Sequence, residues 1–433
     1  MDRATISNLI RETIRYLAGV LPPELHTWHN TIISPAENIT SGQGVNIQAS
    51  TRPPDILMLI DRNPQLLDLW ITELSNDKLY RQVSAARLKG PGVSYWIAPY
   101  NVAHILINDY FSQVTSLTYE EDAAHLVSDG FINSLNKGVS GIKYYGILKG
   151  FACTFDSIEL TNGVTIKRLS TNDLAELRDE NYAIYQEYSH LLWLPNRCVL
   201  QYELIAPILE QPADENIVVD KFKQILRALR LIKGGTVRDL VVFPTKAPGV
   251  LAFSQTSAQY PDIPSFSPMV VQPYSLDEAD IPSLNLMIQT IATELPHWIQ
   301  IVIDRINIAA LRAQTYDSLI DLIIALEAVY GDGKEAIAYK IKMRCALYIE
   351  SDLERRQEVI RIIRAAYNGR SAIVHGNKGA SELETLQPTV QQLLTIVQIT
   401  LMRIVQDVNS GKTPLRGEDF DELILKLLPQ PDN

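Results

Sequence analysis

The chain has 433 residues and a net charge of -11, with 46% hydrophobic and 21% charged residues. This length predicts two or three domains, and the balance is typical of a soluble globular protein, which excludes a disordered or fibrous chain. So acidic a chain is not a general nucleic-acid coat, because binding the phosphate backbone requires Lys and Arg, and any nucleic-acid site must therefore be local.

The cysteines and the N-terminus bear on the compartment. Cys153, Cys198 and Cys345 lie far apart without CxxC spacing, so we expect free buried thiols in a reducing cytosol. Residues 1–21 contain five charged side chains and no continuous apolar stretch, which predicts no signal peptide. No uncharged apolar run approaches the ~18 residues of a transmembrane helix. We expect a cytoplasmic protein with no membrane partner.

The first region, residues 1–140, is predicted to be mostly helical. Apolar residues recur at helical spacing from Ile6 to Val20, which predicts a helix there. Residues 57–74 predict further amphipathic helix with a break at Pro64. Residues 102–111 and 123–135 are also expected to be helical.

The second region, residues 141–282, is predicted to be richer in strands. Asn162-Gly163 lies between short apolar runs at 158–160 and 164–166, which predicts a hairpin because its turn needs positive φ. The other predicted elements are strands at 142–155, 197–205, 240–243 and 250–253, a helix at 218–232, and an irregular proline-rich connector at 255–282.

The third region, residues 283–433, is predicted to be helical throughout. Leu319, Leu322, Ile323, Leu326 and Val329 form one apolar stripe, which predicts an amphipathic helix. Three more such stripes follow, and a helix over 288–313, kinked at Pro296, precedes them. Short connections favour an antiparallel bundle. The predicted fold class is α+β, with a mixed α/β N-terminal region followed by an all-α bundle.

One pair of residues at the end of a predicted bundle helix can carry chemistry. Arg370 and His375 have four residues between them, and Gly376 follows as a plausible helix terminator. Five residues correspond to ~500° of rotation and ~7.5 Å of rise. The two side chains therefore do not share a face, which favours a composite site formed by two copies of the chain. From spacing alone, an ordinary helix C-terminus is the more common explanation.

The flanking sequence is more specific than this spacing. In order and spacing, four phrases resemble the Apea-like HEPN family: Arg305-Ile306-Asn307-Ile308-Ala309, Leu322-Ile323-Ile324-Ala325-Leu326-Glu327-Ala328, Lys342-Met343-Arg344-Cys345-Ala346 and Tyr367-Asn368-Gly369-Arg370-Ser371-Ala372-Ile373-Val374-His375-Gly376. The resemblance covers about residues 300–377. It implies a helical HEPN domain that dimerises and often cleaves RNA without a metal ion.

The residue types suit this implied chemistry. RNA carries its own nucleophile, the 2′-hydroxyl, and a histidine can take or give the proton. An arginine stays charged and can bridge two phosphate oxygens. The expected catalytic residues are thus Arg370 and His375, and neither a metal ion nor another cofactor is expected. By the same resemblance, Glu327 and Arg344 are expected to be a supporting pair that orients the site or the bundle, and Ser371 is a further supporting residue.

The local charge agrees with an RNA site. Between Lys334 and Lys378 there are ten basic and five acidic residues, a local charge of +5. Arg361 and Arg364 lie on the motif helix and are expected to hold RNA phosphates, although an ordinary solvated face is the alternative. His26 and His29 could form half of a metal site, but no matching His or Cys pair follows.

The resulting hypothesis is an RNA endonuclease that acts as a homodimer, with RNA, tRNA among the candidates, as its substrate. Many HEPN nucleases serve as toxins or antiviral defence effectors, so residues 1–280 would sense a trigger or restrain the nuclease, a statement that rests on analogy. A separate antitoxin partner is a further alternative. The competing hypothesis is a non-catalytic HEPN module for dimerisation or ligand binding.

Overall fold

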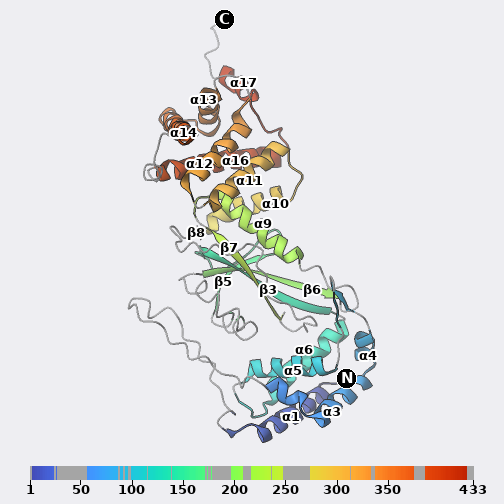
Figure 1. Ribbon diagram of the computed structural model, residues 1–433. Helices are drawn as coiled ribbons and strands as arrows, with labels where there is room; N and C mark the ends of the chain where they lie inside the picture. The colour runs from blue at the N-terminus through green and yellow to red at the C-terminus, as the bar shows by residue number, and fades with distance from the viewer. Residues whose placement is uncertain are drawn as a thin grey trace. The chain divides into compact units, whose positions relative to one another are not determined.

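The computed structural model covers the 433-residue chain (Figure 1). The described residues are 2–374 and 386–426, with the exception of 24–25, 27–55, 86–87, 91–92, 96–98, 115, 138, 171–172, 174–176, 178–196, 208–215, 236, 247–273, 313 and 333–336. The expected strand at 250–253 and most of the expected connector lie outside them.

The chain divides into two compact units. Unit 1 comprises residues 1–147, 168–220 and 241–260, and unit 2 comprises residues 148–167, 221–240 and 261–433. Both units combine segments that are distant in sequence. The three consecutive regions expected from the sequence, 1–140, 141–282 and 283–433, are a different kind of division and stay a prediction.

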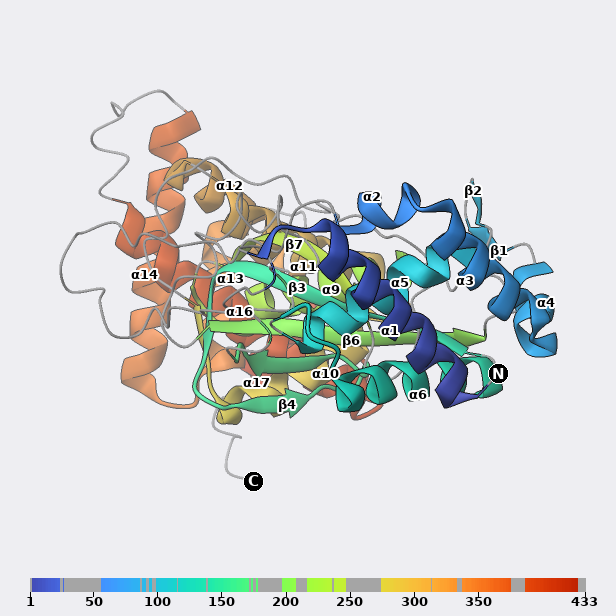
Figure 2. The same ribbon diagram turned by 90° about the horizontal axis from the view of Figure 1, so that it is seen from below.

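Helices that share one apolar core begin unit 1. Their bounds are α1 (Arg3–Val20), α2 (Ile56–Asp61), α3 (Pro64–Asn76), α4 (Lys78–Ala85), α5 (Pro99–Gln113) and α6 (Glu121–Lys137). The expected break at Pro64 is confirmed, because this proline opens α3. α1 packs along α6 (Figure 2). The fully buried Trp70 donates its Nε1–H to Thr13 Oγ1 at 3.1 Å, which joins α3 to α1.

Two sheets are present among the described residues. The short hairpin of β1 (Leu88–Gly90) and β2 (Val93–Tyr95) lies in the expected helical region, so the sequence prediction missed it. The six-stranded sheet has the order β4-β5-β6-β3-β7, and β8 pairs with β3. Its strands are β3 (Val139–Cys153), β4 (Ser157–Glu159), β5 (Thr165–Arg168), β6 (Arg197–Pro207), β7 (Arg238–Lys246) and β8 (Tyr274–Leu276).

The expected Asn-Gly hairpin is confirmed. β4 and β5 pair antiparallel, with Glu159 opposite Thr165, and Gly163 in the turn has φ 80°. A side chain at Gly163 would be strained there, which is why the turn favours glycine. β8, in contrast, pairs parallel to β3 and lies inside the connector that was expected to be irregular from 255 to 282. That expectation is wrong for residues 274–276, because strand pairing with a distant partner leaves no local sequence signal.

The expectation of three free cysteines is wrong for two of them. Cys153 and Cys198 are disulfide-bonded, whereas Cys345 is a buried free thiol. Cys153 ends β3 and Cys198 lies in β6, and these strands are neighbours in the sheet. Their wide separation in sequence concealed this adjacency.

Unit 2 contains α9 and a helical bundle. The bounds are α9 (Asn216–Ile232, of which residues from 221 belong to this unit), η3 (Glu278–Asp280), α10 (Ile281–Ile291), α11 (His297–Leu311), α12 (Thr315–Tyr330), α13 (Ile337–Ile349), α14 (Leu353–Val374), α16 (Gln387–Asn409) and α17 (Asp419–Lys426). The expected kinked helix over 288–313 is in fact two helices, α10 and α11, with Pro296 as the N-cap of α11. Proline removes a backbone donor there, so the break is complete.

α12 lies at the centre of the bundle. It packs against α11, α13, α14 and α16, and α14 lies beside α12 and α13 in both ribbon views (Figure 1, Figure 2). The apolar stripe from Leu319 to Val329 is buried, as its helical spacing predicts. The fold is therefore mixed α/β with a helical C-terminal part. Among the described residues, no helix combines the length and apolarity needed to cross a bilayer.

Candidate active site

Glu327 lies near the C-terminal end of the central helix α12, next to the residues that terminate the helix. Gly331 is the C-cap, and its N–H donates to the carbonyl oxygen of Glu327 at 3.0 Å. A Cβ on Gly331 would lie 2.5 Å from the same oxygen. Only glycine avoids this clash, so the residue that ends α12 also fixes the backbone at Glu327.

Arg370 reaches Glu327 from the neighbouring helix α14. Its Nη1 donates to Glu327 Oε1 at 2.6 Å, and the two side chains are 36% and 29% exposed. Arg370 lies four residues before the last residue of α14, Val374. The cation is thus anchored to α12 while part of the guanidinium remains accessible to solvent, an arrangement that can hold a bound anion.

Tyr367 completes this cluster from one turn earlier on α14. Its hydroxyl donates to the same Glu327 Oε1 at 3.2 Å. Burial, followed by the nearby Glu327 carboxylate, raises the pKa of Tyr367 far above the usual value of a phenol. The hydroxyl therefore remains a donor at all physiological pH values. Tyr367 and Arg370 converge because residues three apart share a helix face.

Close packing holds α14 against its neighbours at this level. Gly369 is buried, and a Cβ on it would lie 3.1 Å from a methyl of Leu319 and 3.3 Å from one of Leu386. The absence of a side chain at 369 lets α14 approach α12 closely. This approach brings Arg370 within reach of Glu327.

Two other sequence-predicted residues adjoin Arg370 along the chain. Ser371 is exposed at the next position of α14. His375, the expected second catalytic residue, lies outside the described residues, so its expected position in the last helical turn stays a prediction. α14 is described to Val374, one residue before it.

The expected RNA-binding arginines differ from each other in their surroundings. Arg361 forms an exposed ion pair with Glu358 at 2.5 Å, and nine residues place it ~180° around the helix from Arg370. Arg364 is exposed, has no ion pair with another described residue, and aligns within ~20° of Ser371 on the helix surface. Six residues place Arg364 ~120° around the helix from Arg370, so neither arginine shares the face of Arg370, and Arg364 lies nearer to that face than Arg361 does.

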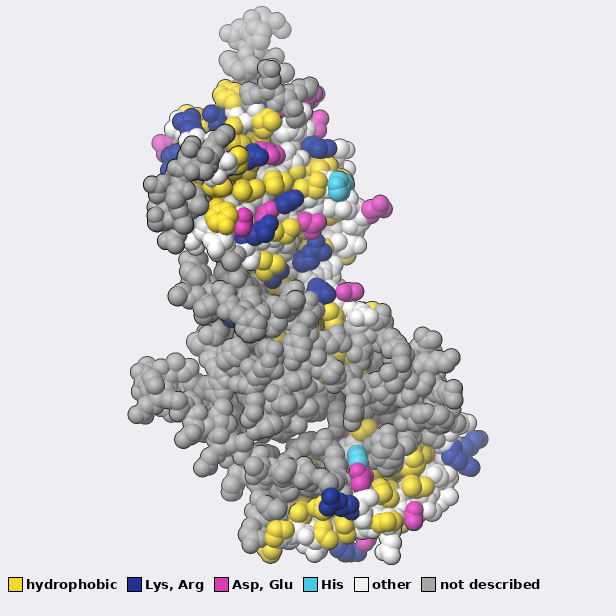
Figure 3. Space-filling view, viewed as in Figure 1, with side chains coloured by type: hydrophobic (Ala, Val, Ile, Leu, Met, Phe, Trp, Pro, Cys, Tyr) yellow, Lys and Arg dark blue, Asp and Glu magenta, His cyan; other side chains and the backbone are white. Residues whose placement is uncertain are grey.

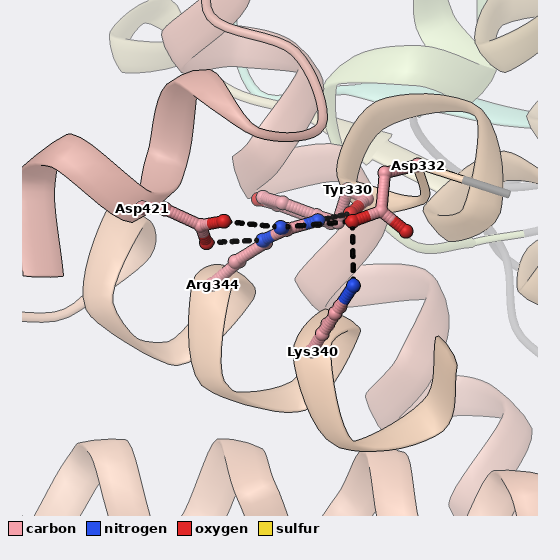
Figure 4. Close-up of polar contacts among 5 residues, drawn as sticks. All are labelled: Tyr330, Asp332, Lys340, Arg344 and Asp421. Carbon is pink, nitrogen blue, oxygen red and sulfur yellow. Dashed lines mark hydrogen bonds and ion pairs between the residues drawn. The ribbon is translucent and has the colours of Figure 1, made fainter. Parts of the chain in front are cut away.

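Arg344 does not pair with Glu327, contrary to the expected supporting pair. Its side chain is 1% exposed and donates to both oxygens of Asp421, at 2.8 and 2.7 Å, and to Tyr330 O at 2.7 Å. Asp332 accepts from Arg344 at 3.2 Å and from Lys340 at 2.8 Å (Figure 4). Bidentate geometry and a carbonyl partner satisfy the buried guanidinium.

This buried network joins three elements. Arg344 belongs to α13, Asp421 to α17, and Tyr330 is the last residue of α12. A cation at a helix C-terminus also interacts favourably with the helix dipole. The Arg344 hydrogen bonds lower the pKa of Asp421, and the Asp421 hydrogen bonds raise that of Arg344. Arg344 therefore orients the bundle, and Glu327 alone of the two contacts the candidate catalytic arginine.

Sequence reasoning missed two partners, Tyr367 and Asp421. Tyr367 had a usable signal, its i, i+3 spacing from Arg370. Asp421 had none, because it lies 77 residues from Arg344 in sequence. In the described part of the chain, no group of three or more His, Cys, Asp or Glu side chains is arranged to hold a metal ion.

Comparison of the chain with models of known protein families, with curated proteins and with solved structures finds no match.

Proposed function

We propose that the C-terminal part of this chain is a HEPN-type RNA endonuclease that works as a dimer and needs no metal ion. The supporting observation is the partly exposed Arg370 guanidinium, held 2.6 Å from Glu327 near the end of α14 and five positions before His375. Arg370 thus provides a permanent cation for a phosphate group, and His375 follows it in the sequence as a residue type that can transfer protons near neutral pH.

The proposed reaction is transesterification within the RNA. His375 takes the proton of the 2′-hydroxyl, whose oxygen attacks the adjacent phosphorus and expels the 5′-oxygen of the next nucleotide. A protonated histidine, supplied by the second protomer, gives its proton to that leaving oxygen, so the protons balance. Arg370 donates to the non-bridging phosphate oxygens as negative charge develops on them.

Glu327 and Tyr367 act in this proposal as positioning residues. The carboxylate holds one end of the Arg370 guanidinium, and the hydroxyl of Tyr367 holds the carboxylate. Arg370 therefore meets the phosphate already oriented, which lowers the entropic cost of reaching the transition state. In the cell, the activity would suit a toxin or an antiviral defence effector, with residues 1–280 as the sensing or restraining part.

The Arg370–Glu327 pair also supports a second candidate, a HEPN module that dimerises or binds a ligand without cleaving RNA. The ion pair neutralises the Arg370 cation and can hold the two packed helices α12 and α14 together. In that case, replacing Arg370 would change stability or assembly, and His375 would have no chemical role.

RNA cleavage by the purified chain in EDTA, with total cellular RNA as substrate, separates the two candidates. We expect His375→Ala to lower the rate by ~10²–10⁴-fold, the usual contribution of a general acid or base, and Arg370→Ala by ~10²–10³-fold. Arg361→Ala is the matched control, because it removes an arginine from the opposite face of α14 and should retain the rate. Equal cleavage by all variants, or none by the unmodified chain, would exclude the nuclease for the free protein.

A mixing experiment tests the dimer. If each site draws residues from two protomers, combining the inactive Arg370→Ala and His375→Ala proteins should restore part of the activity, whereas neither recovers alone. Sedimentation of the same samples gives the fraction of dimer. Dimers that form without any recovery would contradict a composite site.

A further inference from the structure

The first turn of α13 exposes an aromatic ring. Tyr339 is 59% exposed, and it is the one aromatic side chain among the exposed large hydrophobic residues of the described part of the chain. Ile337 beside it is 37% exposed. A single exposed apolar residue is common on protein surfaces. Whether this ring is a binding surface therefore depends on the residues around it.

A lysine accompanies the ring. Lys342 Nζ lies 5.0 Å from the centroid of the Tyr339 ring, within the range of a cation–π contact. The pair therefore presents a flat aromatic surface with a positive charge against it. Aromatic rings flanked by cations are the usual platform for unpaired nucleic-acid bases, because every base has a face that can stack.

The helical hairpin that carries this ring is basic. From Ile337 to Val374, α13, α14 and their connection contain eight basic and four acidic residues within a chain of net charge -11. Lys and Arg side chains gather over α14 next to hydrophobic side chains over α13 (Figure 3). A local positive field of this kind attracts a phosphate backbone.

Tyr339 and the motif residues lie on consecutive helices that pack against each other. α13 ends at Ile349 and α14 begins at Leu353. Arg364 and Arg370 both belong to α14, where six residues separate them by ~9 Å of rise and ~120° of rotation. The ring, the exposed Arg364 and the candidate catalytic arginine thus belong to one pair of packed helices.

We propose that Tyr339 is a stacking platform for an unpaired base of a single-stranded RNA that binds to the basic pair of helices α13 and α14. This inference rests on the proposed function and names its substrate class, because stacking on Tyr339 requires a base that is not already paired in a duplex. Lys342 contributes charge beside the ring, and the ring contributes contact area that does not depend on charge.

Binding is measured with the full chain carrying His375→Ala, so that the probe stays intact. The probes are a short fluorescein-labelled oligoadenylate and its duplex with oligouridylate, followed by anisotropy over a series of salt concentrations. We expect Tyr339→Ala to raise the Kd for the single strand by about 5- to 100-fold, the usual effect of losing one base–aromatic stack. Tyr339→Phe keeps the ring and should stay within about 2-fold. Ile337→Ala, the matched apolar control on the same turn, should do the same.

Salt dependence separates stacking from charge. Tyr339→Ala should leave the slope of log Kd against log salt unchanged, whereas Lys342→Gln should reduce it by about one. The inference is overturned if Tyr339→Ala and Tyr339→Phe bind alike, if the duplex loses as much affinity as the single strand, or if the unmodified surface binds neither probe.

The failures of the two proposals are distinguishable. Cleavage in EDTA that is lost in His375→Ala but unaffected by Tyr339→Ala would retain the nuclease and reject the platform. Ring-dependent binding of the single strand by a chain that cleaves no RNA would retain the platform and reject the nuclease.

Discussion

Arg370 of α14 and Glu327 of α12 form an ion pair of 2.6 Å that joins two packed helices 43 residues apart in sequence. Tyr367 donates to the same carboxylate oxygen. The carboxylate therefore has two partners on one helix, and the direction of the Arg370 guanidinium depends on it. The first prediction concerns this dependence.

Glu327→Gln should lower the maximal rate of RNA cleavage by about 10-fold or more without weakening RNA binding. The amide can still accept a hydrogen bond, but it no longer holds the cation by charge, so Arg370 is less well oriented. Removing a negative charge beside the phosphate site does not oppose RNA binding. Glu358→Gln, in the exposed pair with Arg361, is the control and should change neither quantity. A rise in Kd with an unchanged maximal rate would contradict a positioning role.

Arg344→Ala should destabilise the protein by about 3–5 kcal/mol, because it leaves the mostly buried Asp332 carboxylate and the Tyr330 carbonyl without their guanidinium partner. Denaturant unfolding measures the free energy of unfolding. Arg361→Ala removes an exposed arginine of α14 and should leave that free energy nearly unchanged. Similar losses in both variants would show that the buried network contributes little.

The Arg344–Asp421 pair predicts a pH dependence of stability. Hydrogen bonds from Arg344 hold the pKa of Asp421 below its usual 3.8. A carboxylate with a lowered pKa in the folded state contributes stability that is present above the unfolded value and lost as the pH falls through the folded value. We therefore expect Asp421→Asn to reduce the free energy of unfolding near pH 6, by at most about 1 kcal/mol because this side chain is half exposed.

At a pH below the lowered pKa of Asp421 in the folded protein, the same comparison should give nearly equal stabilities, since both side chains are then neutral. Urea titrations of the two proteins at both pH values provide the test. A difference that stays constant down to the lowest pH would assign the effect to packing instead of charge.

Gly331→Ala should destabilise unit 2 by about 1–3 kcal/mol, the usual cost of forcing atoms into a filled position. The new Cβ would lie 2.5 Å from the carbonyl oxygen of Glu327, a backbone atom that cannot move aside alone. The end of α12 must shift, so the cleavage rate should fall as well. Gly234→Ala is the control, because no atom lies within 4 Å of a Cβ there. Equal unfolding curves for the two variants would contradict the close approach.

The elements that sequence predicts well are those with local causes. The helices at Arg3–Val20 and Thr315–Tyr330 follow from apolar spacing, and the turn at Gly163 follows from the need for positive φ. The elements that sequence missed depend on distant partners. Residues 274–276 become a strand only because β3 lies beside them.

In the candidate site, too, the residues with a local sequence signal could be predicted, and the partners that are distant in sequence could not. Arg370 could be selected from its spacing and its flanking residues, and Tyr367 shares its helix face. The partner of Arg344 could not be inferred, because the choice between Glu327 on α12 and Asp421 on α17 is made by helix packing and not by sequence distance. Charge patterns identify which residues need partners, and only the fold assigns those partners.

The last turn of α12 depends on a segment close to the C-terminus of the chain. Gly417 donates its N–H to Val329 O at 2.8 Å, and Asp421 receives the guanidinium that also binds Tyr330 O. A proteolytic cut or a truncation before residue 417 would remove both supports from the helix that carries Glu327. An affinity tag is therefore better placed at the N-terminus. A C-terminally shortened protein that loses activity would have a destabilised α12, even though every candidate catalytic residue is still present.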